Sequence, residues 1–156
     1  MNLAHVHLLL NHLPPLGVLF GFLLLAAAVA RKSGELIRAS LVTFVLVALL
    51  AIPTYLTGEP AEEIVEDMPG VSMMDITAHE ESAEASLIAA LVLGVLSCFK
   101  LVFYRGRETP RGIAVATLAL ALVVTVMMAW TAHLGGLVHH AEIRAGAAAA
   151  TPAEKD

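Results

Sequence analysis

The stretch from Ile113 to Val138, IAVATLALALVVTVMMAWTAHLGGLV, decides the fold class of this chain. It holds no Asp, Glu, Lys or Arg. An apolar run of about 20 residues is long enough to cross the hydrocarbon core of a bilayer as a helix. Three further apolar runs lie upstream, at Leu8–Ala30, Leu36–Tyr55 and Ala83–Tyr104. We therefore expect four transmembrane helices.

The connections between these runs predict how the helices are arranged. Residues 31–35 and 105–112 form short connections, which join antiparallel neighbours, whereas residues 57–82 form one long acidic outer loop. The sequence thus predicts an all-α, integral membrane, up-down-up-down four-helix bundle over residues 1–144. We expect a disordered tail at residues 145–156. The Pro14-Pro15 pair is expected to kink or restart the first helix just after His12.

The composition agrees with a membrane protein. Of the 156 residues, 58% are hydrophobic and 15% are charged, and the mean hydropathy is +0.81. Soluble domains are about half apolar and about a quarter charged. The formal net charge of −5 argues against nucleic acid as a partner. Cys98 is the only cysteine, which excludes an intrachain disulfide and a covalent haem link through Cys-x-x-Cys-His.

Basic residues gather at one end of the predicted bundle. Seven of the nine Lys and Arg residues lie in or beside the two short connections: Arg31, Lys32, Arg38, Lys100, Arg105, Arg107 and Arg111. Cytoplasmic flanks of membrane helices are enriched in Lys and Arg. We therefore expect a multi-pass protein of the bacterial inner membrane, with the short connections in the cytoplasm and both termini in the periplasm.

The seven histidines lie near the outer ends of the predicted spans. Ionisable side chains at membrane depth are costly and usually face the bundle interior, where they have a partner or a function. A helix rise of about 1.5 Å per residue places His12 and His133 in the deeper layer. The candidate cofactor ligands are His7, His12, His79, His133 and His140. The alternative is that these rings sit among lipid headgroups.

Two kinds of cofactor suit several imidazoles in an apolar bundle. Two imidazoles on facing helices make the axial pair of a b-type haem, and no cysteine is needed. Three imidazoles with Glu59 or Glu80 would instead make a zinc or copper site. The candidate ligands spread over more than about 10 Å along the helices, which favours one or two haems over a single small ion.

Several short motifs occur in a fixed order along the chain. The motifs are His7, His12 and Pro14; Thr57-Gly58; His79; and Thr131-Ala132-His133-Leu134-Gly135-Gly136 followed by His140. Together they resemble a family of small histidine-rich four-span bacterial membrane proteins of unassigned function, which are suspected haem binders. Leu8 stands where the family usually has Pro after its first His. The resemblance implies haem binding and an association with redox proteins.

These observations predict a membrane-embedded b-type cytochrome, or a haem-binding subunit of a respiratory or electron-transfer complex, with its cofactor near the periplasmic face. The alternatives are a transition-metal-binding membrane protein and a structural subunit of a larger complex. Expected partners are the lipid bilayer and a periplasmic c-type cytochrome or other redox subunit, with quinone as a further candidate. The acids between Glu59 and Asp75 would steer a basic partner. No catalytic triad, phosphate loop or nucleotide fingerprint occurs, so we expect an electron-transfer subunit rather than an enzyme in its own right.

Overall fold

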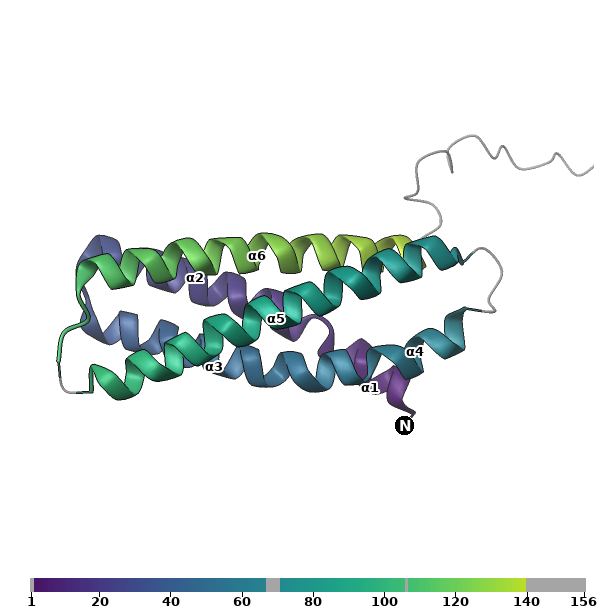
Figure 1. The fold of residues 1–156 in the computed structure, drawn as a ribbon, viewed down its shortest axis with the longest axis horizontal. Helices are drawn as coiled ribbons and strands as arrows, with labels where there is room; N and C mark the ends of the chain where they lie inside the picture. Colours follow the sequence, from purple (N-terminus) through teal and green to yellow (C-terminus); the bar gives the residue numbers. More distant parts are fainter. Residues whose placement is uncertain (1, 67–70, 106, 140–156) are drawn as a thin grey trace, which may run out of the picture.

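The computed structural model describes residues 2–66, 71–105 and 107–139, and in these ranges every regular element is a helix (Figure 1). His140 and the predicted tail lie outside the described residues. The helices are α1 (Leu3–Leu10), α2 (Leu13–Arg31), α3 (Gly34–Leu56), α4 (Gly58–Val65), α5 (Met73–Phe103) and α6 (Arg111–His139).

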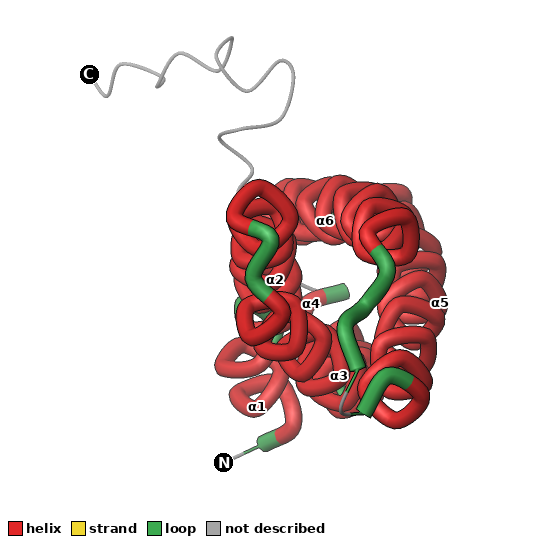
Figure 2. Tube along the Cα trace, turned by 90° about the vertical axis from the view of Figure 1, so that its left-hand side faces the viewer, coloured by secondary structure: helices red, strands yellow, loops and turns green. Residues whose placement is uncertain are grey.

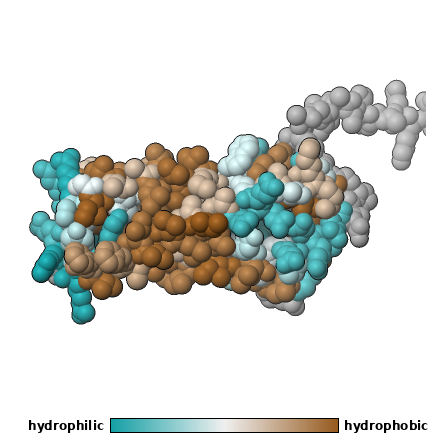
Figure 3. Space-filling model, in the orientation of Figure 1, coloured by the Kyte–Doolittle hydropathy of each residue, from teal (hydrophilic) through white to brown (hydrophobic). Residues whose placement is uncertain are grey.

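Four long helices form the bundle. Viewed from one end, α2, α3, α5 and α6 lie around a square, each packed against its two neighbours (Figure 2). Each of the four candidate spans contains a segment with a mean hydropathy of 2.2 to 2.4. Figure 3 shows a hydrophobic band across the middle of the molecule and hydrophilic residues towards both ends. The all-α four-helix membrane bundle predicted from the sequence is confirmed.

Helix packing in the middle of the bundle depends on small residues. Phe44 on α3 is fully buried and lies over Gly21 on α2, where an added Cβ would be 2.6 Å from the Phe44 ring. Close backbone approach at small residues is the usual basis of helix association in lipid. Leu25, Leu93 and Val124 are also buried and complete the apolar core from α2, α5 and α6.

The first predicted span is broken into two helices. α1 ends at Leu10, and α2 begins at Leu13 with Pro14 and Pro15 in its first turn. Proline suits the first turn of a helix because its missing N–H would have no intrahelical partner there. The same missing N–H prevents α1 from continuing. The break therefore falls where the proline pair predicts it.

The predicted acidic outer loop is largely helical. It contains α4 and the first turns of α5, which begins at Met73 rather than at Ala83. The Ser72 side chain accepts a hydrogen bond from the Asp75 amide at 3.4 Å and caps the helix, and an acid in the first turn complements the helix dipole. Hydropathy identifies only the part of a helix that lies in lipid, so it did not predict the polar first turns of α5.

The two ends of the bundle differ in chemistry. The α2–α3 and α5–α6 connections, which carry most of the basic residues, share one end (Figure 1). We call this the basic end. α1, α4, the start of α5 and the final turns of α6 lie at the opposite end, which we call the histidine end. Within the described residues, the bundle therefore separates its cations from its imidazoles by the length of a membrane span.

Candidate functional site

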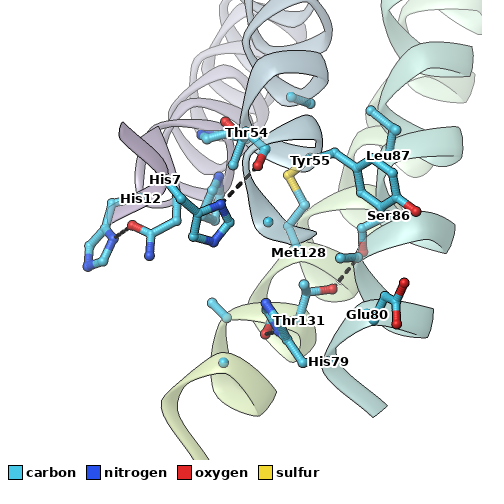
Figure 4. Close-up of a pocket in the computed structure, with 18 of the residues that line it drawn as sticks. His7, His12, Thr54, Tyr55, His79, Glu80, Ser86, Leu87, Met128 and Thr131 are labelled. Atoms are coloured by element: carbon cyan, nitrogen blue, oxygen red, sulfur yellow. Dashed lines mark hydrogen bonds between the residues drawn. The ribbon is translucent and has the colours of Figure 1, made fainter. Parts of the chain in front are cut away.

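A cavity of about 790 Å³ occupies the histidine end. All six helices contribute to its lining, and its volume falls within the range of about 300–1,000 Å³ that is typical of ligand and cofactor sites. Apolar side chains such as Ile76, Leu87 and Met128 form much of its wall. Histidine, tyrosine and glutamate side chains also reach it (Figure 4).

His79 on α5 is held against α6. Its Nδ1 lies 3.0 Å from the carbonyl oxygen of Thr131. A carbonyl oxygen only accepts hydrogen bonds, so the ring nitrogen donates, and the neutral form of this ring then carries its lone pair on Nε2. Gly135 lies under the ring, where an added Cβ would be 2.9 Å from Cε1 of His79. A side chain at position 135 would therefore require the His79 ring to move.

Hydroxyl groups reinforce this contact between α5 and α6. The Thr131 Oγ1 atom lies 2.7 Å from Ser82 Oγ and 2.8 Å from Ser86 Oγ, and Ser86 is buried. Each hydroxyl can donate one hydrogen bond and accept others, so the cluster satisfies itself inside the bundle. It ties the turn of α6 that carries the Thr131 carbonyl to the turns of α5 that follow His79.

His7 on α1 makes a similar contact with α3. Its Nδ1 lies 3.0 Å from the carbonyl oxygen of Thr54 and 3.3 Å from Thr57 Oγ1 (Figure 4). The carbonyl again requires the ring nitrogen to donate, which places the lone pair on Nε2. Gly58 lies beside the ring, and an added Cβ there would be 3.7 Å from Cε1 of His7.

The two contacts have the same construction. In each, a ring N–H of histidine is bonded to the carbonyl of a threonine on another helix, and a glycine four residues after that threonine lies against the ring. Thr131 and Gly135 lie one turn apart on the same face of α6, whereas Thr54 is in the last turn of α3 and Gly58 is the first residue of α4. We call each unit a histidine clasp. The motif Thr-x-x-x-Gly, present at Thr54–Gly58 and Thr131–Gly135, was the sequence signal that could have found both.

The other candidate histidines have different places. His12 is exposed and lines the cavity, and its Nδ1 is hydrogen-bonded to the side-chain oxygen of Asn11. His133 is exposed, does not line this cavity and packs on Trp130 with ring centroids 5.5 Å apart. The structure thus brings three of the predicted ligands, His7, His12 and His79, to one cavity. Depth alone would have ranked His12 and His133 first.

The described donor residues do not converge on a site for a small metal ion. Within the described ranges, no group of three or more His, Cys, Asp or Glu side chains is placed to hold one metal ion. A zinc or copper site normally takes three or four such ligands, whereas a b-type haem takes two imidazoles. The predicted site of three imidazoles with Glu59 or Glu80 is therefore not assembled in the described part of the chain.

The mouth of the cavity is acidic. Glu59, Glu62 and Glu80 line it, and no Lys or Arg among the described residues does. Glu62 on α4 lies within electrostatic reach of Glu80 on α5 and of Glu59. The negative field of these acids would stabilise positive charge inside the cavity.

Comparisons with protein-family models, with curated proteins and with solved structures found no match to this chain.

Proposed function

We propose that the chain is a membrane-embedded b-type haem protein that transfers electrons at its histidine end, with His7 and His79 as the axial ligands of one haem. The observation that carries the proposal is the pair of histidine clasps. They bring two imidazoles to one cavity from separate helix pairs, α1–α3 and α5–α6, and both rings are held in the same tautomer.

The clasps suit ligation because the hydrogen bond in each one fixes the orientation of its ring. Ligating histidines almost always donate their other N–H to a carbonyl, carboxylate or water, which sets the ring plane and raises the basicity of the ligating nitrogen. A haem held in this way would supply a one-electron redox couple. The apolar wall at Ile76, Leu87 and Met128 would exclude water from it.

The position of the cavity indicates where the electrons leave. If the basic end is cytoplasmic, as its Lys and Arg residues predict, the cavity lies at the periplasmic face. The proposed partner is then a periplasmic one-electron carrier such as a c-type cytochrome, or a neighbouring redox subunit. Exposed acids of the histidine end, including Glu63, Glu66 and Glu81, would attract a basic partner surface.

The visible spectrum of the full-length protein, purified from membranes, tests this proposal. We expect a reduced-minus-oxidised α-band of the bis-imidazole type and one haem per chain by pyridine haemochrome assay. A colourless protein that carries zinc or copper would support metal binding instead, and a colourless, metal-free protein would support a structural subunit. Either of these results would overturn the proposal.

A further inference from the structure

The rim of the cavity carries a third imidazole that the axial pair does not use. His12 lies at the break between α1 and α2, is exposed and lines the cavity. The side-chain oxygen of Asn11 accepts a hydrogen bond from its Nδ1, and in the neutral ring this leaves Nε2 as the acceptor. We propose that this rim binds the hydroxylated ring of a quinol that enters from the lipid bilayer.

The cavity opens sideways onto the apolar surface of the bundle. Leu8, Leu16 and Leu19, which flank His12 along the chain, line the cavity and are also 53%, 61% and 40% exposed. Leu56 on α3 shares both properties. A ligand dissolved in lipid can therefore reach the rim without passing through water. An exposed imidazole among leucines at this depth is costly, which is the usual mark of a functional position.

The polar groups of the rim select the kind of ligand. Nε2 of His12 accepts hydrogen bonds, and the carboxylates of Glu59 and Glu62, which line the same cavity, also accept them. No Lys or Arg among the described residues lines the cavity, so the rim offers no cation to pair with a phosphate headgroup or a fatty-acid carboxylate. The matching ligand is neutral, carries O–H donors and partitions into lipid.

A quinol meets these conditions. Its ring hydroxyls donate to the acceptors of the rim, and its hydrocarbon tail lies along Leu16 and Leu19 on the outer surface of α2. Binding makes and breaks no covalent bond. The role of the bound quinol as an electron source rests on the proposed function, whereas its binding at His12 does not.

The test is the affinity of a decyl-benzoquinol probe for the full-length protein in lipid nanodiscs, measured by isothermal titration calorimetry. His12→Leu should weaken binding by about tenfold, the equivalent of one hydrogen bond of about 1.4 kcal/mol. His133→Leu is the matched control, because His133 is also exposed at the histidine end but does not line the cavity. Its affinity should equal that of the unmodified protein.

Two further arms make the test independent of how well His12→Leu folds. Leu16→Trp should obstruct the lateral opening, whereas Leu23→Trp, on an exposed position of α2 outside the cavity, should not. The dimethyl ether of the probe, which has no O–H donor, should bind at least about tenfold more weakly than the quinol. Equal binding of quinol and ether would overturn the proposal, as would equal affinities of the two tryptophan variants.

The haem spectrum of the same samples separates this inference from the proposed function. Quinol binding that depends on His12 in a colourless protein would support the quinol site and overturn the haem proposal. A haem-loaded protein whose quinol affinity is the same in His12→Leu and His133→Leu would retain the proposed function and overturn the quinol site. Anionic phospholipid that competes with the probe would show that the rim accepts headgroups, which would also overturn it.

Discussion

The two histidine clasps use the same parts but are held with different firmness. His79 projects from α5, a helix of 31 residues that contributes Leu93 and other side chains to the core. His7 projects from α1, a helix of 8 residues that buries none. The glycine of the α5–α6 clasp would place a Cβ 2.9 Å from its ring, whereas that of the α1–α3 clasp would place one at 3.7 Å.

This difference indicates that the two clasps have different roles in binding a cofactor. A short helix has little stability of its own and depends on its packing, and segments with few buried contacts open at low free-energy cost. We therefore expect the α5–α6 clasp to be preorganised before a cofactor binds. The α1–α3 clasp should close around the cofactor as α1 docks against α3 and α4.

The largest expected effect comes from removing the rings themselves. His79→Ala should lower haem affinity by more than the roughly 10–100-fold that loss of an outer partner of a ligand costs. His7→Ala should retain more haem, in a five-coordinate high-spin form, because its clasp is the compliant one. Haem content and the visible spectrum measure both effects.

One control variant and two possible outcomes test the predicted difference between His7 and His79. His133→Ala should keep full haem content, because His133 lies outside the cavity. Equal losses in His7→Ala and His79→Ala would remove the difference between the clasps. Full haem content in both would show that the axial pair is misassigned.

An intermediate effect is expected at the glycines. Gly135→Ala should displace the His79 ring and cost about 1–3 kcal/mol, as overpacking of a tight site usually does. Gly58→Ala should be neutral or stabilising by about 0.4–1 kcal/mol, because its contact distance is ordinary and alanine restricts the unfolded chain. Denaturant unfolding in detergent, followed through helical circular dichroism, measures both changes. Equal effects of the two substitutions on stability would contradict the predicted difference between the clasps.

The smallest expected effect concerns the hydroxyl cluster. Thr131→Val keeps the carbonyl that holds His79 but removes the hydrogen bonds to Ser82 and Ser86. Interhelical hydrogen bonds in membranes contribute about 0.6 kcal/mol on average and about 1.7 kcal/mol at most, so the loss of stability should lie in that range. A shift in the haem midpoint potential should accompany it, since the turn of α6 that carries the Thr131 carbonyl is no longer tied to α5.

Thr125 provides the matched control for this substitution. It lies on the same helix, lines the same cavity and bonds its hydroxyl to the carbonyl of Ala121 at 2.7 Å, within α6. Thr125→Val should therefore leave stability and potential nearly unchanged, and Thr131→Ser should restore both. A Thr131→Val protein that behaves like Thr125→Val would show that the cluster does not position His79.

Much of the architecture could be predicted from the sequence because it depends on local properties. Four helices long and apolar enough to span a membrane follow from hydropathy, and the break before Leu13 follows from the proline pair. The gathering of histidines at one end follows from counting along those helices. The start of α5 at Met73 was missed because hydropathy does not report helix outside lipid, although Ser72 and Asp75 are a capping signal.

Which histidines meet was decided by the tertiary structure. Position along a helix is readable from the chain, but the direction of a side chain depends on how the helix is rotated against its neighbours. The break at Asn11 turns α1 so that His7 meets α3, and packing of α5 on α6 brings His79 to the carbonyl of Thr131. The Thr-x-x-x-Gly spacing marks both acceptor positions in the sequence, but it does not say which ring will reach them. The sequence by itself determined a four-helix membrane bundle with imidazoles at one end, and only long-range packing selected the pair that shares a cavity.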